Sequence, residues 1–126
     1  MTAIQLINSL PVIQKLMDLK LPVKKAYSIY TLAKQINDNR EFFIKEEKKI
    51  IDKFNVTILE SGNLEFKSPE DQLQFIEEHN ELSNYEVEDF NIIELSFDDL
   101  KEAELSALEI AALDGIIKFI DWQGVI

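Results

Sequence analysis

The stretch between Pro22 and Phe54 constrains this chain most, because apolar side chains recur there every three or four positions with no interior glycine or proline. This spacing predicts one long helix over about residues 22 to 54, which would measure about 50 Å if unbroken. Helix propensity is weakest at residues 37–39, where the sequence is Asn-Asp-Asn, so a break would fall there. So long a helix in a chain of 126 residues predicts a protruding element.

Local turn signals divide the residues that follow the long helix. Short apolar runs on either side of Glu60-Ser61-Gly62 predict a β-hairpin over about residues 56–66. Ser68 followed by Pro69 is a strong helix start, since the hydroxyl caps the backbone and proline fits the first turn. We therefore expect a helix over about residues 69–83. Three of its side chains are expected to face inward: Leu73, Phe75 and Ile76.

The last third of the chain predicts a strand followed by short helices. Apolar and aromatic residues over about 85–96 favour a strand with an irregularity near Asp89. Two hydroxyl-then-carboxylate pairs fit helix caps and predict short helices between about residues 97 and 114, with Gly115 ending the second. The paired capping residues are Ser96 with Asp99 and Ser106 with Glu109.

These elements amount to a predominantly helical α+β fold. We expect one domain over residues 1–126: a long helical hairpin that bears a small β-hairpin, then a short strand plus a C-terminal helix. Ser9 and Pro11 predict a further helix over about residues 10–19 at the N-terminal side. Apolar residues make up 46% of the chain, which is enough to build a core at this length.

The charge balance limits the classes of partner. With 13 basic and 24 acidic residues, the chain has a net charge of −11, which repels nucleic acid and anionic membranes. We therefore expect no direct contact with nucleic acid and none with membranes. Basic residues gather in the first third and acidic residues dominate 60–105, an arrangement that suits a basic partner or serves only to keep the protein soluble.

The residues needed for catalysis are scarce. The chain has no cysteine, which excludes thiolate nucleophiles and cysteine-ligated metals, and its one histidine is His79. We expect His79 to lie on a solvated helix face. Only three glycines are present, so no glycine-rich phosphate loop can be formed, and no calcium-loop spacing occurs among the carboxylates. The sequence predicts a non-enzymatic protein with no cofactor and no metal site.

Polar residues interrupt the apolar stripe of the long helix. Arg40 and Glu47 lie within it, and polar groups on a buried seam specify register or face a wet interface. The segment after Gly115 is very apolar, which is typical of either core or a docking surface. We therefore expect part of the stripe and of this segment to be covered by another chain. The candidate interface residues are Tyr30, Ile36, Arg40, Phe43, Glu47, Ile50, Phe54, Phe119 and Trp122.

Several motifs resemble one family. The chain has Lys20-Leu21-Pro22-Val23-Lys24-Lys25-Ala26-Tyr27 before a charged helix. Three later runs follow: Tyr85-Glu86-Val87-Glu88, Leu95-Ser96-Phe97-Asp98-Asp99-Leu100 and Leu105-Ser106-Ala107-Leu108-Glu109. These runs resemble small uncharacterised acidic proteins of tailed bacteriophages, with a KLPVK-x-AY start, a long charged helix, an acidic strand and a short final helix. The likeness covers roughly residues 15 to 115. This chain departs from the family in its short middle hairpin and in the tail after Gly115.

The resemblance implies a phage origin and no known enzymatic activity, with no catalytic residue to carry over. The expected function is protein–protein contact, as a minor structural or assembly component of the virion, with partners that are further copies or other phage proteins. The expected location is the host cytoplasm during infection, or the virion. The alternative is an inhibitor of a host enzyme or defence complex that uses its acidic surface as a mimic of DNA.

Overall fold

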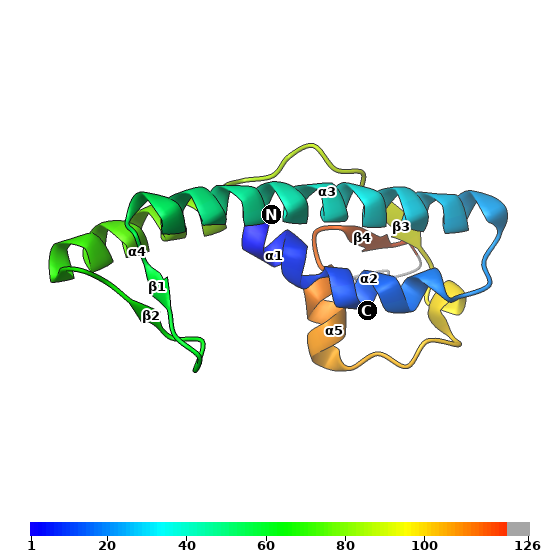
Figure 1. The fold of residues 1–126 in the computed structure, drawn as a ribbon. Helices are drawn as coiled ribbons and strands as arrows, with labels where there is room; N and C mark the ends of the chain where they lie inside the picture. Colours follow the sequence, from blue (N-terminus) through cyan, green and yellow to red (C-terminus); the bar gives the residue numbers. More distant parts are fainter. Residues whose placement is uncertain (121–126) are drawn as a thin grey trace.

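A single long helix forms the spine of the molecule. The computed structural model describes residues 1–120, and within it α3 (Val23–Lys53) runs unbroken for 31 residues. At 1.5 Å per residue its length is about 46 Å. Figure 1 shows the N-terminal helices and the C-terminal elements gathered along its first half, while a β-hairpin and a second long helix extend from its far end. The expected helical α+β fold is confirmed.

The break considered at residues 37–39 does not occur. Asn39 Nδ2 donates to the carbonyl of Gln35, one turn earlier, at 2.9 Å. The apolar residues on either side of the weak stretch, Ile36 and Phe43, are both buried. Burial of two such side chains stabilises the helix by about 1.5–3 kcal/mol each, which exceeds a propensity cost of about 0.7 kcal/mol per residue.

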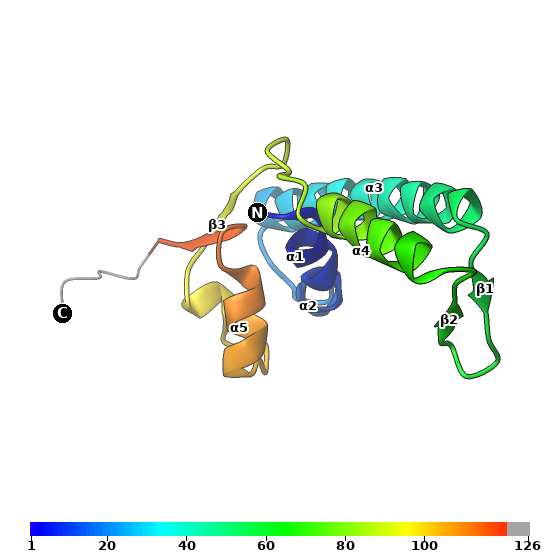
Figure 2. The same ribbon diagram turned by 90° about the vertical axis from the view of Figure 1, so that its left-hand side faces the viewer.

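The first half of α3 carries the core of a compact body. Helices α1 (Ala3–Asn8) and α2 (Leu10–Met17) pack against α3, while β3 (Ile93–Leu95) also contacts α3 and α5 (Ala107–Leu113) contacts α2. Figure 2 shows these elements grouped at one end of the molecule. The largest fully buried apolar side chains all belong to this body: Leu6, Ile13, Leu16, Ile29, Leu32, Ile36, Leu95, Leu113 and Ile116.

A second short helix precedes the helix predicted near the N-terminus. The helix expected over 10–19 is α2, which ends at Met17, and α1 precedes it with a capping box in which Thr2 and Gln5 bond each other's backbone. Ser9 joins the two helices and is fully buried. Its hydroxyl donates to the Leu6 carbonyl at 2.5 Å, so the polar group of Ser9 is satisfied inside the core.

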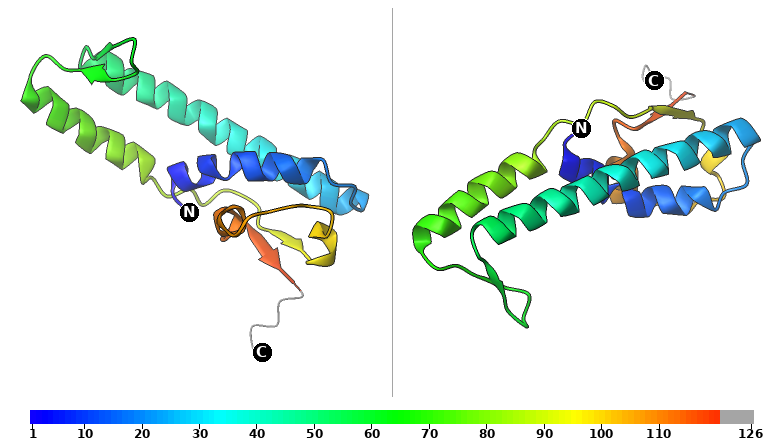
Figure 3. Two further views of the ribbon diagram at one scale, coloured as in Figure 1. Left: turned by 90° about the horizontal axis from the view of Figure 1, so that it is seen from below. Right: turned by 45° about the horizontal axis from the view of Figure 1, so that its top comes forward.

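Residues 44–83 form what we call the arm, which extends beyond the body. It consists of the last part of α3, strands β1 (Thr57–Ile58) and β2 (Leu64–Glu65), and α4 (Pro69–Ser83). The two strands pair antiparallel, and α4 lies beside the second half of α3 in both views of Figure 3. The expected helical hairpin, with a β-hairpin at its tip, is confirmed.

The start of α4 follows its local signals. The Ser68 side chain accepts the Asp71 N–H at 3.1 Å, Pro69 occupies the first turn, and the helix spans 69–83 as expected. Its inward face, however, is narrower than the sequence suggests. Within residues 44–83 only Phe54 and Phe75 are buried. The arm therefore has very little core of its own.

The strand expected over 85–96 is wrong in its extent. Only β3 forms a ladder, while the backbone before it joins the N-terminus instead: the Val87 N–H donates to the Met1 carbonyl at 3.0 Å. A strand needs a neighbouring strand to satisfy its backbone groups. The partner of β3 is β4 (Ile117–Phe119), which is only three residues long, so the ladder stops there.

Strands β3 and β4 pair in parallel, with Ile93 opposite Ile117. The turn between α5 and β4 contains Gly115 at a φ of +93°, a left-handed conformation that favours glycine. Gly115 thus ends the second short helix as expected. Ile116 and Ile117 are buried, so the apolar residues directly after the turn belong to the core.

Both predicted caps form. Ser96 and Asp99 exchange bonds of 3.1 and 2.9 Å around the short 3₁₀ helix η1 (Asp98–Leu100), and Ser106 and Glu109 exchange two bonds of 3.1 Å at the start of α5. The same carboxylates reach lysines of distant helices. Lys25 of α3 donates to Asp99 at 2.6 Å and Lys15 of α2 pairs with Glu109. Each cap therefore also ties a C-terminal segment to the N-terminal half of the body.

The Lys25–Asp99 pair makes stability depend on pH. The Lys25 ammonium, together with the Ser96 N–H, holds the pKa of Asp99 below its ordinary value. A lowered folded-state pKa adds stability that is complete above the unfolded pKa and is lost as the pH falls through the folded pKa. We expect Asp99→Asn to lower the free energy of unfolding by about 1–2 kcal/mol at pH 7, and the difference from the parent to shrink towards pH 3. Urea denaturation at both pH values measures this.

The control is Asp89→Asn, at an exposed carboxylate without an ion pair within the described residues. We expect it to change the unfolding free energy by less than about 0.5 kcal/mol at either pH. An equal loss in both variants, or a loss in Asp99→Asn that does not shrink on acidification, would contradict the assignment.

The arm is expected to unfold separately from the body. Phe75→Ala removes one of its two buried side chains, at a cost of about 3 kcal/mol. Amides of residues 44–83 should then exchange with deuterium much faster, while those of α1 and α2 stay protected. Leu73→Ala, on the exposed side of the same helix, should leave both patterns unchanged. A uniform rise over arm and body would show that they unfold as one unit.

Candidate functional site

The structure divides the predicted interface residues into two groups. Ile36, Phe43 and Phe54 are buried inside the chain, and Ile50 is half-buried. Helices α1 and α2 contact the first half of α3, and α4 contacts α3 as well. For these apolar positions the expectation that another chain covers the stripe is wrong, because the chain covers them itself. Ile36, Phe43 and Phe54 are not available to a partner in this fold.

Glu47 has a partner within the chain. Its carboxylate lies 2.8 Å from Nε2 of His79, which belongs to α4. The expectation that His79 is solvated is wrong: the imidazole is partly buried, with its plane nearly parallel to the Phe75 ring at 5.7 Å between centroids and edge-on to Phe43 at 6.0 Å. The seam position of Glu47 therefore serves the register between α3 and α4.

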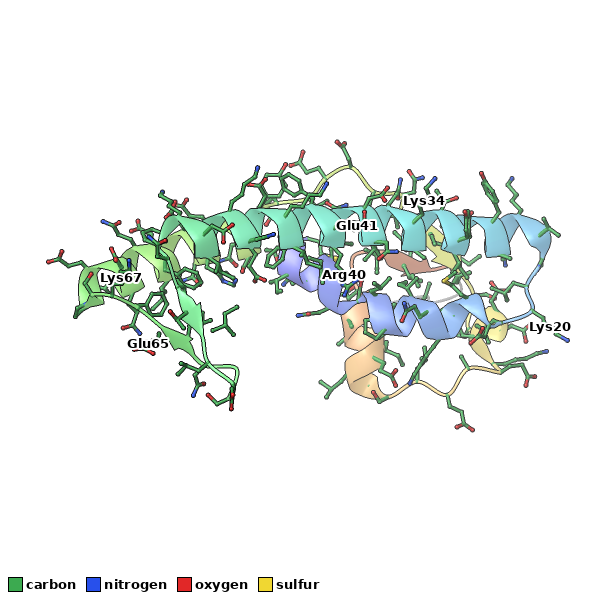
Figure 4. All side chains as sticks on the ribbon, viewed as in Figure 1. Lys20, Lys34, Arg40, Glu41, Glu65 and Lys67 are labelled. Carbon is green, nitrogen blue, oxygen red and sulfur yellow. The ribbon has the colours of Figure 1, made fainter. Side chains whose placement is uncertain are left out.

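The other predicted residues lie at or near the surface. Tyr30 is exposed, with its ring 6.2 Å from that of Tyr27. Arg40 is exposed, and Figure 4 shows it beneath α3, towards α1. Phe119 is half-buried and stacks on Phe97 at 5.2 Å. Trp122 lies outside the described residues. These exposed positions are not adjacent to one another, so they do not make one site.

A different set of apolar side chains does share one side of the arm. Phe43 and Ile50 lie on the α3 side that meets α4, and Phe75 is the buried α4 residue. Ile44 follows Phe43, Ile51 follows Ile50, and Ile76 follows Phe75 in the sequence. Each of these isoleucines is therefore turned by about 100° around its helix axis, in the same direction, from the residue before it. In an antiparallel pair of helices the same rotational sense points to the same side. Leu73, three residues before Ile76, extends this row on α4.

Two of these residues were expected to face inward. Leu73 is 69% exposed and Ile76 is 44% exposed, and Ile44 is 47% exposed. The prediction for Leu73 and Ile76 is wrong because α4 is covered along one narrow line, where Phe75 alone is buried. The helical spacing identified an apolar side of α4 correctly, but the chain provides no second layer to cover it.

The β-hairpin adds to the same surface. Ile58 and Leu64 are cross-strand partners, so their side chains lie on one face of the two-stranded sheet, and both are exposed. Phe66, two residues after Leu64, shares that face and contacts the Phe75 ring at 5.1 Å. The hairpin therefore packs against α4 through Phe66 and Phe75. We call the whole surface the arm face: Ile44, Ile51, Ile58, Leu64, Leu73 and Ile76.

The two helices of the arm differ in charge. After Phe43, α3 carries four lysines and three carboxylates, whereas α4 carries five carboxylates and neither lysine nor arginine. Lys45 and Lys48 are exposed on α3 and Glu70 and Glu77 on α4, and none of the four forms an ion pair within residues 1–120. Asp52 of α3 is likewise exposed and forms no ion pair within these residues, so α3 presents free charges of both signs and α4 presents free negative charge.

The body has one further apolar surface. A groove of about 860 Å³ lies beside α5 and β4, with Ile110, Ile117 and Phe119 among its lining residues. Within the described residues no group of three or more histidine or acidic side chains is placed to hold a metal ion. No described helix is long and apolar enough to cross a membrane. The site with the largest exposed apolar set is the arm face.

A scan against models of protein families, a search of curated proteins and a search of solved structures each found no match to this chain.

Proposed function

We propose that this protein is a non-enzymatic component of a tailed bacteriophage that acts through contacts with other proteins, as a minor structural or assembly protein. The phage assignment is supported by the motifs that begin at Lys20 and recur up to Glu109. The contact function is supported by the shape and the apolar surface of the arm. On this proposal the protein works in the host cytoplasm during infection, or in the particle.

The observation that carries the contact function is an excess of surface. The chain exposes 8980 Å², whereas a compact monomer of 14.6 kDa exposes about 6,900 Å². The difference is about 2,000 Å² over the whole chain. A stable protein–protein interface needs about 800 Å² from each partner, so this excess is enough for one.

The apolar content of that surface supports the same conclusion. Soluble monomers rarely expose large contiguous apolar patches, and those that exist mark contact sites. The arm face offers five exposed aliphatic side chains and the half-buried Ile51, on an element with only two buried residues. Such a face gains stability from a protein that covers it.

The test is made in cells infected with the phage that encodes this chain. Deletion of the gene should lower the yield of complete particles, and peptides of the protein should be found by mass spectrometry in virions or in assembly intermediates. Ile76→Asp should give the deletion phenotype because it places a charge on the arm face, whereas Leu108→Asp, at an exposed site on α5, should not. A normal particle yield after deletion, with no peptides in any particle, would overturn the proposal.

The alternative, an inhibitor with an acidic surface, has one observation in its favour. Residues 60–104 contain only two basic side chains, Lys67 and Lys101, among many exposed carboxylates. The segments that carry them do not form one row: Figure 1 shows β1 and β2 at one end of the molecule and the segment between β3 and α5 towards the other. An inhibitor of this kind would capture a basic host protein with an affinity that falls steeply as salt rises, and DNA would compete for it.

A further inference from the structure

We propose that the open edge of β4 binds an extended segment of a different protein, which adds a third strand to the sheet of β3 and β4 and fills the groove beside α5. The inference goes beyond the proposed function, because it concerns the body and not the arm. Three observations carry it: unpaired backbone groups on β4, the position of the groove, and the charge of Lys118.

The hydrogen bonds of the parallel ladder use only one side of β4. The Ile93 N–H donates to the Ile116 carbonyl at 2.9 Å. Successive residues of a parallel strand direct their backbone groups alternately towards the neighbouring strand and away from it. With Ile93 opposite Ile117, the groups of Lys118 also face β3. The N–H and C=O groups of Ile117 and Phe119 therefore point away from β3.

These outward groups have no hydrogen-bond partner within residues 1–120. In that part of the chain the sheet consists of β3 and β4 alone, so the edge of β4 is open. Ile117 is only 5% exposed, which leaves its backbone groups little contact with water. Buried backbone groups without a partner are costly. A strand can supply a donor and an acceptor at every second residue, whereas the backbone groups of a helix are already paired.

The groove runs along this open edge. Successive side chains of a strand point to opposite faces, so a groove on one face of a sheet is lined by every second residue. Here all three residues of β4 line the groove of about 860 Å³, together with Ala107, Ile110 and Ala111 of α5. These α5 residues are three or four positions apart and share one side of the helix. The groove thus lies where an added strand would pair, with an apolar side of α5 beside it.

Lys118 favours a different protein over a second copy. It lines the groove and forms no ion pair within the described residues, although Glu94 is its cross-strand neighbour. A second copy that paired antiparallel with all of β4 would place Lys118 opposite Lys118, and like charges directly opposite each other are destabilising. An acidic side chain at that position is favourable instead. The segment that fits is therefore extended, with a carboxylate between two apolar residues that pair with Ile117 and Phe119.

Amide hydrogen exchange of the purified full chain, followed by NMR, tests the open edge without a ligand. We expect the Phe119 amide to exchange at least about 10-fold faster than the Lys118 amide, since only the second is bonded in the ladder. Equal protection of the two amides would show that the edge is already paired and would overturn the proposal.

The ligand is selected from a random dodecapeptide display library on the full chain. We expect enriched peptides to alternate apolar residues with an acidic one, and a synthetic copy to protect the Phe119 amide. Methylation of alternate backbone nitrogens of this peptide should weaken binding at least about 10-fold in one register and under about 2-fold in the other, because an edge strand bonds through every second residue. No enrichment, a helical spacing of apolar residues, or equal losses in both registers would overturn the added strand.

Matched variants locate the bound peptide. Ile110→Asp, in the groove, should weaken binding at least about 30-fold because it places a carboxylate beside an apolar strand. Leu108→Asp, at an 84% exposed site of α5 outside the groove, should bind like the parent. Lys118→Glu should weaken binding about 5-fold, and lysine in place of the acidic residue of the peptide should restore it. Circular dichroism confirms that the variants keep their helices.

Equal losses in the two α5 variants, or no recovery in the charge exchange, would overturn the assignment to this groove. Sedimentation velocity separates a second copy from a different protein, since a dimer of the parent chain that the peptide dissociates would place another copy on β4. All these measurements use the purified chain and leave the arm face intact. Their failure is therefore distinct from a failure of the particle-yield test in infected cells.

Discussion

The packing of α1 and α2 on the first half of α3 is the interaction on which the rest of the molecule depends. Leu32 and Ile36 of α3 are fully buried there with Leu16 of α2, and they fix one half of a helix that is about 46 Å long. Because the helix has no break, the second half is held rigidly outside the body. The arm is therefore positioned by burial that takes place elsewhere, and its own side chains are left free for contact.

This division explains why so few polar networks are found on the arm. In the body, Asp99 and Glu109 each accept bonds from a cap and from a lysine of an N-terminal helix, so they join segments that are far apart in sequence. On the arm, two ion pairs join α3 and α4: Glu47 with His79, and Lys53 with Glu78. Half-exposed pairs of this kind contribute less than about 1 kcal/mol. The arm thus belongs to the least stable part of the structure, as contact elements commonly do.

Sequence reasoning succeeded where the signal is local. Ser68 and Pro69 define the start of α4, and the Ser106–Glu109 pair defines the start of α5, because a cap involves only neighbouring residues. It failed where a distant partner decides. The strand over 85–96 is limited by the three residues of β4, and the exposure of Leu73 and Ile76 depends on how much of α4 the rest of the chain covers.

The same reasoning explains why the exposed apolar surface lies on a different side of α3 from the predicted stripe. The stripe through Phe43 and Phe54 was recognised as apolar, but periodicity alone does not say whether the chain or a partner covers it. Ile44, one residue beyond the stripe, is on the side that the chain leaves open. Ile51 lies beside the covered stripe of α3 in the same way as Ile44, and Ile76 lies beside the covered line of α4. Together these side chains make the apolar surface wider than two helices can bury. That surplus width is the physical reason to expect contact with another protein on this side of the arm.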